Sequence, residues 1–278
     1  MSGRQLDEDD VRVKRGRSTR PRSKQRPAHE DAVDAFVVTI DRGRITCALS
    51  ANPDTEVVAV KARELGRKAV TVGDDVGLVG DLSGRPDTLA RLVRIDPRRT
   101  ELRRTADDSD PYERIIVANV DQMGIVVAVA DPPPRIGLID RCLVAAYDAR
   151  VDPLLVLTKV DLGDPAELLA AYRDLDVEAV AVTRGGSLDE LTAHLRDRVS
   201  VFVGHSGVGK STLVNALIPD AARATGGVNQ STGRGRHTST CRRSMWPSVS
   251  LSKSASTNRN SWIHCFLSAN ASTFWAWP

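Results

Sequence analysis

The nine residues from Gly204 to Thr212, GHSGVGKST, constrain the fold of this chain more than any other stretch. An apolar run at residues 199–203 precedes them and predicts a buried strand, and apolar spacing at residues 213–218 predicts a helix after them. The stretch matches the pattern G-x-x-x-x-G-K-[ST], and a strand before it and a helix after it are the context that a phosphate-binding loop requires. We therefore predict that this segment binds a phosphate chain.

The residue types in this stretch suit a phosphate chain. Small residues let backbone N–H groups wrap around the phosphates, and the following helix N-terminus adds partial positive charge. We expect Lys210 to reach the β- and γ-phosphates and Ser211 to hold Mg²⁺, so both are candidate catalytic residues. The predicted nucleotide-binding residues here are Gly204, His205, Ser206, Gly207, Val208, Gly209, Lys210, Ser211 and Thr212. The alternative is a glycine-rich turn that happens to precede a lysine.

Composition limits the class of protein. A chain of 278 residues with 41% hydrophobic residues can form two domains with a buried core. Its apolar runs are too short to span a bilayer, and residues 1–30 lack the apolar region of a secretory signal. The four cysteines form no C-x-x-C pair, which favours a reduced, cytoplasmic protein over a disulfide framework.

The first 112 residues divide into three segments. Residues 1–33 are predicted to be a disordered basic arm, because residues 11–26 hold eight Lys or Arg and no acid. Such an arm suits RNA, and a merely solubilising tail is the alternative. Residues 34–96 contain five short apolar runs separated by turn signals, which predict a small all-β barrel of the OB-fold type. Residues 97–112 are predicted to be a linker whose arginines could lie along a phosphate backbone, namely Arg98, Arg99, Arg103 and Arg104.

From residue 113 the pattern changes to alternating strands and helices. Strands are expected at residues 115–118, 124–130, 154–157, 178–182 and 199–203, and helices at residues 139–149, 165–173 and 188–198. This alternation predicts a parallel sheet with helices on both faces.

A second motif, Thr158-Lys159-Val160-Asp161, stands at the end of the strand expected at residues 154–157. A carboxylate at the carboxyl edge of a parallel sheet is well placed for ligand binding. Asp161 could accept hydrogen bonds from the ring N–H and the exocyclic amine of guanine, which selects GTP over ATP, while the stem of Lys159 covers the base. Residues 183–186 would close over the base from the next loop. An ATPase or kinase is the alternative, and nucleotide competition distinguishes the two.

The guanine motif precedes the phosphate loop, whereas ordinary GTPases have the opposite order. With the N-terminal barrel, this order resembles the ribosome small-subunit-dependent GTPase A family (RsgA/YjeQ type) of circularly permuted GTPases. The stretches that carry the resemblance are residues 72–76, 116–122, 139–146, 158–162, 204–212 and 233–240. The resemblance covers about residues 34–240. It implies an α/β P-loop GTPase domain at residues 113–240, GTP and Mg²⁺ as ligands, and a monomer acting on the small ribosomal subunit and its rRNA late in assembly.

The resemblance also implies roles for individual residues. Thr238 would complete the Mg²⁺ shell and sense the γ-phosphate, with Thr240 as the alternative. Thr158 stands where the family commonly has Asn, so we expect the loss of an amide that usually braces the phosphate loop.

After Thr240 the composition changes abruptly. Residues 241–278 hold nine serines and all four tryptophans, and neither Asp nor Glu follows Asp220. Three features that the resemblance implies are missing from the sequence after the phosphate loop: a D-x-x-G motif, the remaining strands of the GTPase sheet and a zinc-binding Cys/His cluster. The D-x-x-G letters at residues 74–77 and 81–84 fall in the barrel and are interpreted as coincidence. We hypothesise that residues 241–278 are read in a shifted frame, and a genuine tail is the alternative.

Two functions remain open from the sequence. The leading interpretation is a GTP-hydrolysing factor of small-subunit assembly. The rival is an RNA-binding module with a catalytically incomplete nucleotide-binding domain. The aberrant tail should leave a hydrophobic sheet edge unpaired, which predicts poor solubility and little GTP hydrolysis.

Overall fold

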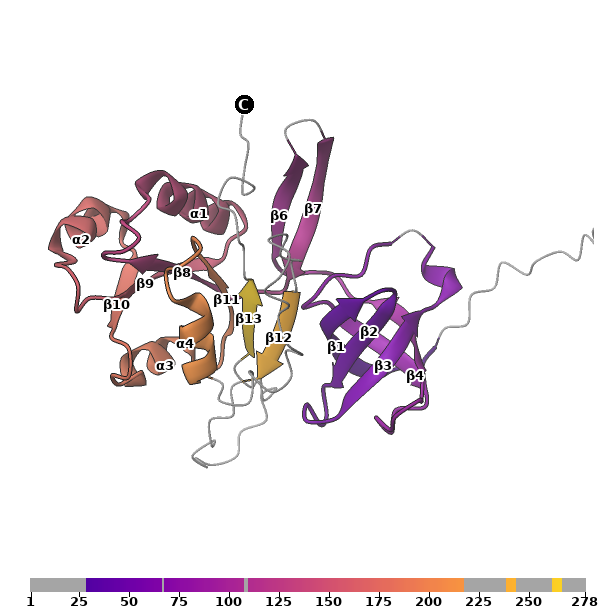
Figure 1. Cartoon of the computed structure of the whole chain (residues 1–278). Helices are drawn as coiled ribbons and strands as arrows, with labels where there is room; N and C mark the ends of the chain where they lie inside the picture. The colour runs from indigo at the N-terminus through magenta and orange to yellow at the C-terminus, as the bar shows by residue number, and fades with distance from the viewer. Residues whose placement is uncertain (1–28, 67, 108–109, 218–238, 244–261, 267–278) are drawn as a thin grey trace, which may run out of the picture. The chain divides into compact units, whose positions relative to one another are not determined.

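A computed structural model describes residues 29–66, 68–107, 110–217, 239–243 and 262–266 (Figure 1). The predicted disordered arm lies almost wholly outside these residues. Five strands come first, followed by a hairpin, an α/β region and two further strands.

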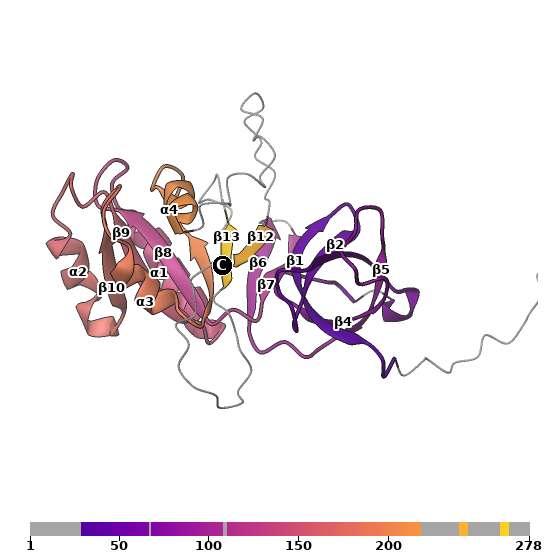
Figure 2. The same ribbon diagram turned by 90° about the horizontal axis from the view of Figure 1, so that it is seen from below.

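The first five strands close into a barrel. They are β1 (Val33–Asp41), β2 (Arg44–Leu49), β3 (Glu56–Lys61), β4 (Asp75–Gly80) and β5 (Ala90–Ile95), with a short 3-10 helix, η2 (Arg63–Leu65), after β3. β1 pairs with both β2 and β4, and β5 pairs with both β3 and β4, which completes the ring seen end-on in Figure 2. Alternate residues point inward and form an apolar core that includes Val37, Cys47 and Leu78. The predicted OB-type barrel is confirmed.

The segment predicted to be a linker is a β-hairpin, so that prediction is wrong. β6 (Glu101–Asp107) pairs in antiparallel fashion with β7 (Asp110–Ala118), and the run expected to be a parallel strand at residues 115–118 is the end of β7. Leu102 and Val117 lie in the core that α1 (Ile136–Asp148) also covers. β6 was not recognisable in the sequence because its segment contains many charged residues. A two-stranded hairpin needs few apolar positions to hold it in place.

The α/β region forms a parallel sheet in the order β10–β9–β8–β11. Its strands are β8 (Gln122–Ala128), β9 (Asp152–Thr158), β10 (Glu178–Val182) and β11 (Val199–Val203). The other helices are α2 (Ala166–Tyr172), the 3-10 helix η3 (Arg173–Leu175), α3 (Asp189–Leu195) and α4 (Lys210–Leu217). α1 begins three residues before the predicted helix, because Ile136 and Gly137 extend the turn.

Helices cover both faces of this sheet, as predicted (Figure 1). Leu155 and Leu157 of β9 pack in one core with residues of α1 and α2. Leu154 and Val156 of the same strand pack in a second core with residues of α3 and α4. A strand that is buried on both faces reads as a continuous apolar run, which explains why these strands were recognisable.

Two strands lie after residue 238, β12 (Ser239–Arg243) and β13 (Trp262–Phe266). β13 pairs in parallel with β11, from Val199 opposite Trp262 to Phe202 opposite Cys265, and β12 pairs with β13. The prediction of an unpaired β11 edge is therefore wrong. Its basis was the missing periodicity, but aromatic and β-branched residues such as Trp262 and Ile263 suit a strand without any alternation.

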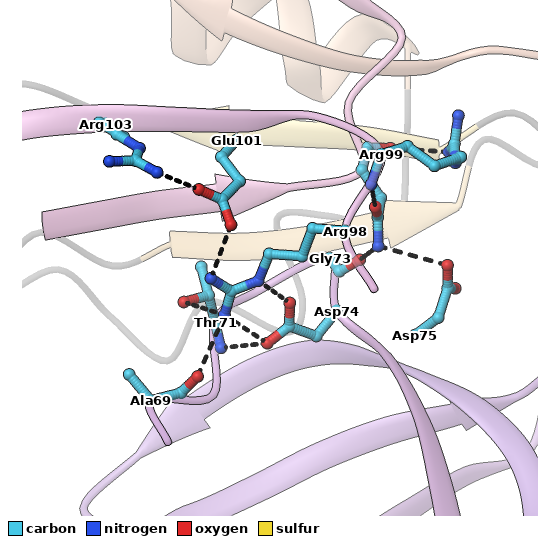
Figure 3. A network of polar contacts seen from close by, with 10 residues as sticks. Ala69, Thr71, Gly73, Asp74, Asp75, Arg98, Arg99, Glu101 and Arg103 are labelled. Atoms are coloured by element: carbon cyan, nitrogen blue, oxygen red, sulfur yellow. Dashed lines mark hydrogen bonds and ion pairs between the residues drawn. The ribbon is translucent and has the colours of Figure 1, made fainter. Parts of the chain in front are cut away.

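A buried ion pair joins the barrel segment before β4 to the chain that leads into β6. Asp74 is fully buried, and its carboxylate accepts hydrogen bonds from Arg98 Nε at 2.6 Å and from Thr71 N at 2.7 Å. Arg98 also donates through Nη2 to Asp74 at 3.0 Å and to the Ala69 carbonyl at 3.0 Å, and through Nη1 to Glu101 at 3.2 Å (Figure 3). Because both charges are hydrogen-bonded, their burial is tolerated.

Asn119, just after β7, extends this network. Its Nδ2 donates to the Gly73 carbonyl at 2.9 Å, and its Oδ1 accepts a hydrogen bond from Arg99 N at 2.8 Å. At Gly73, φ is +88° and a Cβ would lie 2.1 Å from the Ala118 carbonyl oxygen, so this close approach requires glycine. Arg98 and Arg99 thus serve internal contacts, Arg99 through Asp121, and the prediction that they follow a phosphate backbone is wrong.

Replacing Asp74 with Ala is expected to lower the free energy of unfolding by about 3–5 kcal/mol, because Arg98 would lose its buried partner and keep only the longer ion pair with Glu101. The matched control is Asp34→Ala, which removes an exposed partner of Arg94 and should cost at most about 1 kcal/mol. Urea unfolding followed by circular dichroism measures both values. Equal losses for the two variants would contradict the assigned role of the buried pair.

Candidate nucleotide-binding site

The carboxyl ends of four parallel strands meet at one edge of the sheet. The loop after β11 carries the phosphate-loop pattern, and the loop after β9 carries Lys159, Val160 and Asp161. Since β8 alone separates β9 from β11, the structure brings the two predicted motifs to the same edge. This is the place where ligands bind in open α/β sheets.

The start of the phosphate loop passes close to the neighbouring strand. A Cβ on Gly204 would lie 2.3 Å from the Val126 carbonyl oxygen, so glycine is required there. At the other end of the loop, Val208 is buried, and α4 begins at Lys210 with a hydrogen bond from Leu213 N to the Gly209 carbonyl at 2.9 Å. Between these anchored ends, Ser206 and Gly207 are exposed.

Lys210 is held against the backbone of this loop. The side chain is buried, and Nζ donates to the carbonyls of Gly204 at 2.7 Å and His205 at 2.6 Å. His205 Nδ1 lies 2.7 Å from the Ser206 carbonyl. The ammonium is therefore fixed beside the backbone groups that would surround a phosphate, while Ser211 and Thr212 stay exposed at the first turn of α4.

Thr158 braces the phosphate loop, contrary to our expectation from the sequence. Its buried Oγ1 lies 2.6 Å from the Val208 carbonyl and 3.3 Å from the Val127 carbonyl. A hydroxyl has one proton, so the shorter contact is the stronger hydrogen bond. We expected the loss of an Asn amide to remove the brace. The threonine hydroxyl replaces it because β9 ends close enough to Val208 for a shorter side chain to reach.

The guanine motif lies in the turn after β9. Lys159 has a left-handed backbone with φ of 56°, and its Nζ donates to the Asp131 carbonyl. Val160 packs against the core below. Asp161 is exposed, and among the described residues its carboxylate has no hydrogen-bond or ion-pair partner. The motif is therefore anchored by its second and third residues and presents its carboxylate to solvent.

Two other predicted features can be placed. Residues 183–186 form a turn after β10, next to β9, with Gly186 N donating to the Thr183 carbonyl at 3.0 Å. The D-x-x-G letters of Asp74 fall in the buried network and those of Asp81 in the loop after β4, which agrees with their interpretation as coincidence.

The metal ligands predicted from the sequence are partly outside the structure. Thr238 lies outside the described residues, and Thr240 lies in β12, whose side chains are not described. Ser211 is therefore the one predicted Mg²⁺ ligand that can be placed. Within the described part of the chain, His, Cys, Asp and Glu form no group of three or more that could hold a metal ion. That part also has no helix long and apolar enough to cross a membrane.

The buried cysteines take no part in this site. Cys47 lies in the barrel core and Cys142 in α1, and both are free thiols. Burial raises the pKa of each thiol to about 12, so both stay protonated and unreactive at neutral pH.

One contributor was missed by the sequence analysis. The loop of residues 129–135, between β8 and α1, supplies the carbonyl that holds Lys159. Its signal was the run Asp131-Pro132-Pro133-Pro134 directly after a buried strand, which predicts a rigid loop at the ligand edge.

Comparison with known proteins gives a consistent family. A family model described as RsgA GTPase matches residues 95–249. The small ribosomal subunit biogenesis GTPase RsgA of Carboxydothermus hydrogenoformans is 45% identical over 157 residues, covering 55% of this chain and 51% of that protein. The protein of the same name from Nitrosospira multiformis is 36% identical over 233 residues, covering 80% and 66% respectively. The chain thus spans about half to two thirds of the length of these relatives.

Two solved structures share the fold. YjeQ from Thermotoga maritima aligns with a TM-score of 0.59 at 22% identity, covering 86% of this chain and 76% of that one. YloQ, described as a circularly permuted GTPase, aligns with a TM-score of 0.53 at 24% identity, covering 71% and 68%. The predicted fold, a barrel followed by a circularly permuted GTPase domain, is confirmed.

Thr158→Val is expected to lower the free energy of unfolding by about 1–3 kcal/mol, because it removes the donor to the buried Val208 carbonyl without changing the size of the side chain. Thr158→Ser keeps the hydroxyl and should lose much less. Urea unfolding of the two variants measures the difference. If Ser and Val were equally destabilising, the hydroxyl would not be the brace.

Proposed function

Because the chain belongs to the RsgA GTPase family, we propose that it binds GTP with Mg²⁺ at the edge formed by the phosphate loop and the guanine motif, and that this site is built to hydrolyse GTP. The observation that carries the proposal is the convergence of the two motifs at the ends of β9 and β11, with the Lys210 ammonium fixed between two phosphate-loop carbonyls.

Each predicted residue has a role in this site. The backbone from Gly204 to Thr212 surrounds the phosphates, and Lys210 offsets the charge that develops on them. The exposed hydroxyl of Ser211, next to Lys210, suits a Mg²⁺ ligand, and Thr238 is proposed as the second. Bound Mg²⁺ adds positive charge at the β- and γ-phosphates. Asp161 binds guanine, and Thr158 and Lys159 hold the neighbouring loops in place.

We propose the small ribosomal subunit and its rRNA as partners of a monomeric, cytoplasmic chain. The named relatives are small ribosomal subunit biogenesis GTPases. On the outer face of the barrel, the exposed side chains of Arg44 and Arg91 flank Val60 in neighbouring strands, since Arg44 pairs with Val60 and Val60 with Arg91. The strand 2–3 face of OB-folds is a frequent oligonucleotide-binding surface, and the basic residues 11–26 add sequence-independent attraction.

We also propose that residues 241–278 are read in a shifted frame and that the chain as given hydrolyses GTP slowly. The support is the abrupt change of composition after residue 240 and the lack, after the phosphate loop, of a D-x-x-G motif to position Mg²⁺ and the attacking water. The match to the family model ends at residue 249, close to this change. Sequencing the gene across the codons for residues 238–245 tests the frame directly.

Asp161→Asn is expected to weaken GTP binding by about ten- to a hundredfold and to favour xanthosine triphosphate, because an amide donates where the carboxylate accepted. Competition of GTP, ATP and xanthosine triphosphate against a fluorescent guanine nucleotide measures the preference. Asp148→Asn, an exposed substitution at the end of α1, serves as the control and should leave the order unchanged. An unmodified chain that prefers ATP would overturn the guanine assignment.

The purified 278-residue chain should turn over little GTP, with or without small ribosomal subunits, while it still binds the nucleotide. Phosphate release at saturating GTP measures this rate. A rate that rises strongly with added subunits would contradict the proposed defect. The rival function, an RNA-binding module with a scaffold nucleotide domain, predicts subunit binding of equal strength with GTP and with GDP.

A further inference from the structure

A third loop, residues 131–135, lies at the centre of the nucleotide-binding edge. The sheet order β9–β8–β11 places the end of β8 between the strand of the guanine motif and the strand of the phosphate loop. Figure 1 shows the connection from β8 to α1 on the same side of the sheet edge as the start of α4. The backbone of this loop therefore starts between the two halves of the proposed nucleotide site.

This loop contacts both motifs. On the guanine side, the Asp131 carbonyl accepts a hydrogen bond from Lys159 Nζ. On the phosphate side, Pro132 Cδ lies 3.7 Å from the position that a Cβ on Gly207 would occupy. The three prolines at positions 132–134 restrict the backbone, so the residue that follows them, Arg135, has a defined starting point.

Arg135 adjoins the first residues of the phosphate loop. It lines a shallow pocket together with Gly204 and His205, and Pro133, Pro134 and Val208 form other parts of the wall. Gly204 and His205 are also the residues whose carbonyls hold Lys210 Nζ. Arg135 and Lys210 therefore both lie close to Gly204 and His205.

Within the described part of the chain, the charge of Arg135 is not neutralised by an ion pair. The side chain is exposed, and within that part its guanidinium has no hydrogen-bond or ion-pair partner. The nearest acid in sequence, Asp131, is exposed in the same loop, and Asp140 in the next turn of α1 accepts a hydrogen bond from Tyr172 at 2.8 Å. By contrast, Arg94, Arg98, Arg99 and Arg198 each form an ion pair.

We propose that Arg135 contacts the terminal phosphate of the bound nucleoside triphosphate. The terminal phosphate lies next to the phosphate-loop lysine, and a guanidinium can donate two parallel hydrogen bonds to phosphate oxygens. The contact distinguishes a triphosphate from a diphosphate, and it adds a second cation where charge develops during phosphoryl transfer. This inference rests on the proposed nucleotide site and names a further residue in it.

The test compares triphosphate and diphosphate affinities in the full-length chain. Arg135→Ala should weaken the binding of a non-hydrolysable GTP analogue by about ten- to a hundredfold and leave the Kd for GDP within about twofold. Arg135→Lys keeps the charge without the fork of donors and should fall between the two. Arg141→Ala is the matched control, because it removes an exposed arginine from α1, the helix that follows this loop, and should change neither affinity.

Each outcome is decisive. Equal loss of GTP-analogue and GDP affinity, or no loss of either, would overturn the contact with the terminal phosphate. An effect on RNA binding alone would assign Arg135 to the ribosomal surface instead. GDP binding by the unmodified chain tests the proposed function separately, since GDP lacks the group that Arg135 is proposed to bind. If the unmodified chain bound neither nucleotide, the proposed site and this contact would both be refuted.

Discussion

The buried ion pair of Asp74 and Arg98 is the interaction on which the order of the barrel junction depends. A carboxylate with no exposure loses its hydration, and three protein donors at 2.6–3.0 Å replace it here. To supply these donors, the segment before β4 and the chain before β6 must come together in one geometry. The same geometry brings Gly73 against Ala118, where even a methyl group would clash with a backbone carbonyl.

A second set of contacts organises the ligand edge in the same manner, through short polar links between strand ends. Thr158 ties β9 to the phosphate loop through the Val208 carbonyl, and Lys159 ties the guanine motif to the loop after β8. Lys210 closes the set by binding two carbonyls of its own loop. The strands position the loops, and these links fix the loops relative to one another.

Much of the fold followed from the sequence, because its signals were local and physically distinct. Runs such as Leu154–Leu157 are apolar throughout since both of their faces are buried, and GHSGVGKST has few other structural meanings. The hairpin β6–β7 was not predicted because few of its residues are apolar. Leu102 and Val117 instead pack in the core that α1 also covers. β13 was not predicted because its partner, β11, is some sixty residues away in the sequence. Pairing over such a distance leaves no pattern in a short stretch of sequence.

The site was predictable in its motifs but not in its supporting contacts. Residue types at fixed spacing predicted Lys210, Ser211 and Asp161 as site residues, and the structure places all three at the carboxyl edge of the sheet. The use of Thr158 as a brace depends on the distance of 2.6 Å between its Oγ1 and the Val208 carbonyl oxygen in the phosphate loop, which no sequence spacing encodes. In the same way, the sequence predicted the same role for Arg98 and Arg103, as basic linker residues. In the structure, Arg98 is buried against Asp74, whereas Arg103 pairs with Glu101 near the surface.

The hydroxyl of Thr158 has a consequence for the shape of molecule that this edge can accept. It joins the end of the strand that precedes the guanine motif to the last residues of the phosphate loop, and Val129 N donates to the Thr158 carbonyl at 3.0 Å from the strand between them. The distance between the guanine motif and the phosphate loop is thus set by neighbouring strands of one sheet and by short hydrogen bonds between their loops. The distance between the two motifs is therefore fixed in the folded chain, and the proposed nucleotide must match that distance to contact both motifs.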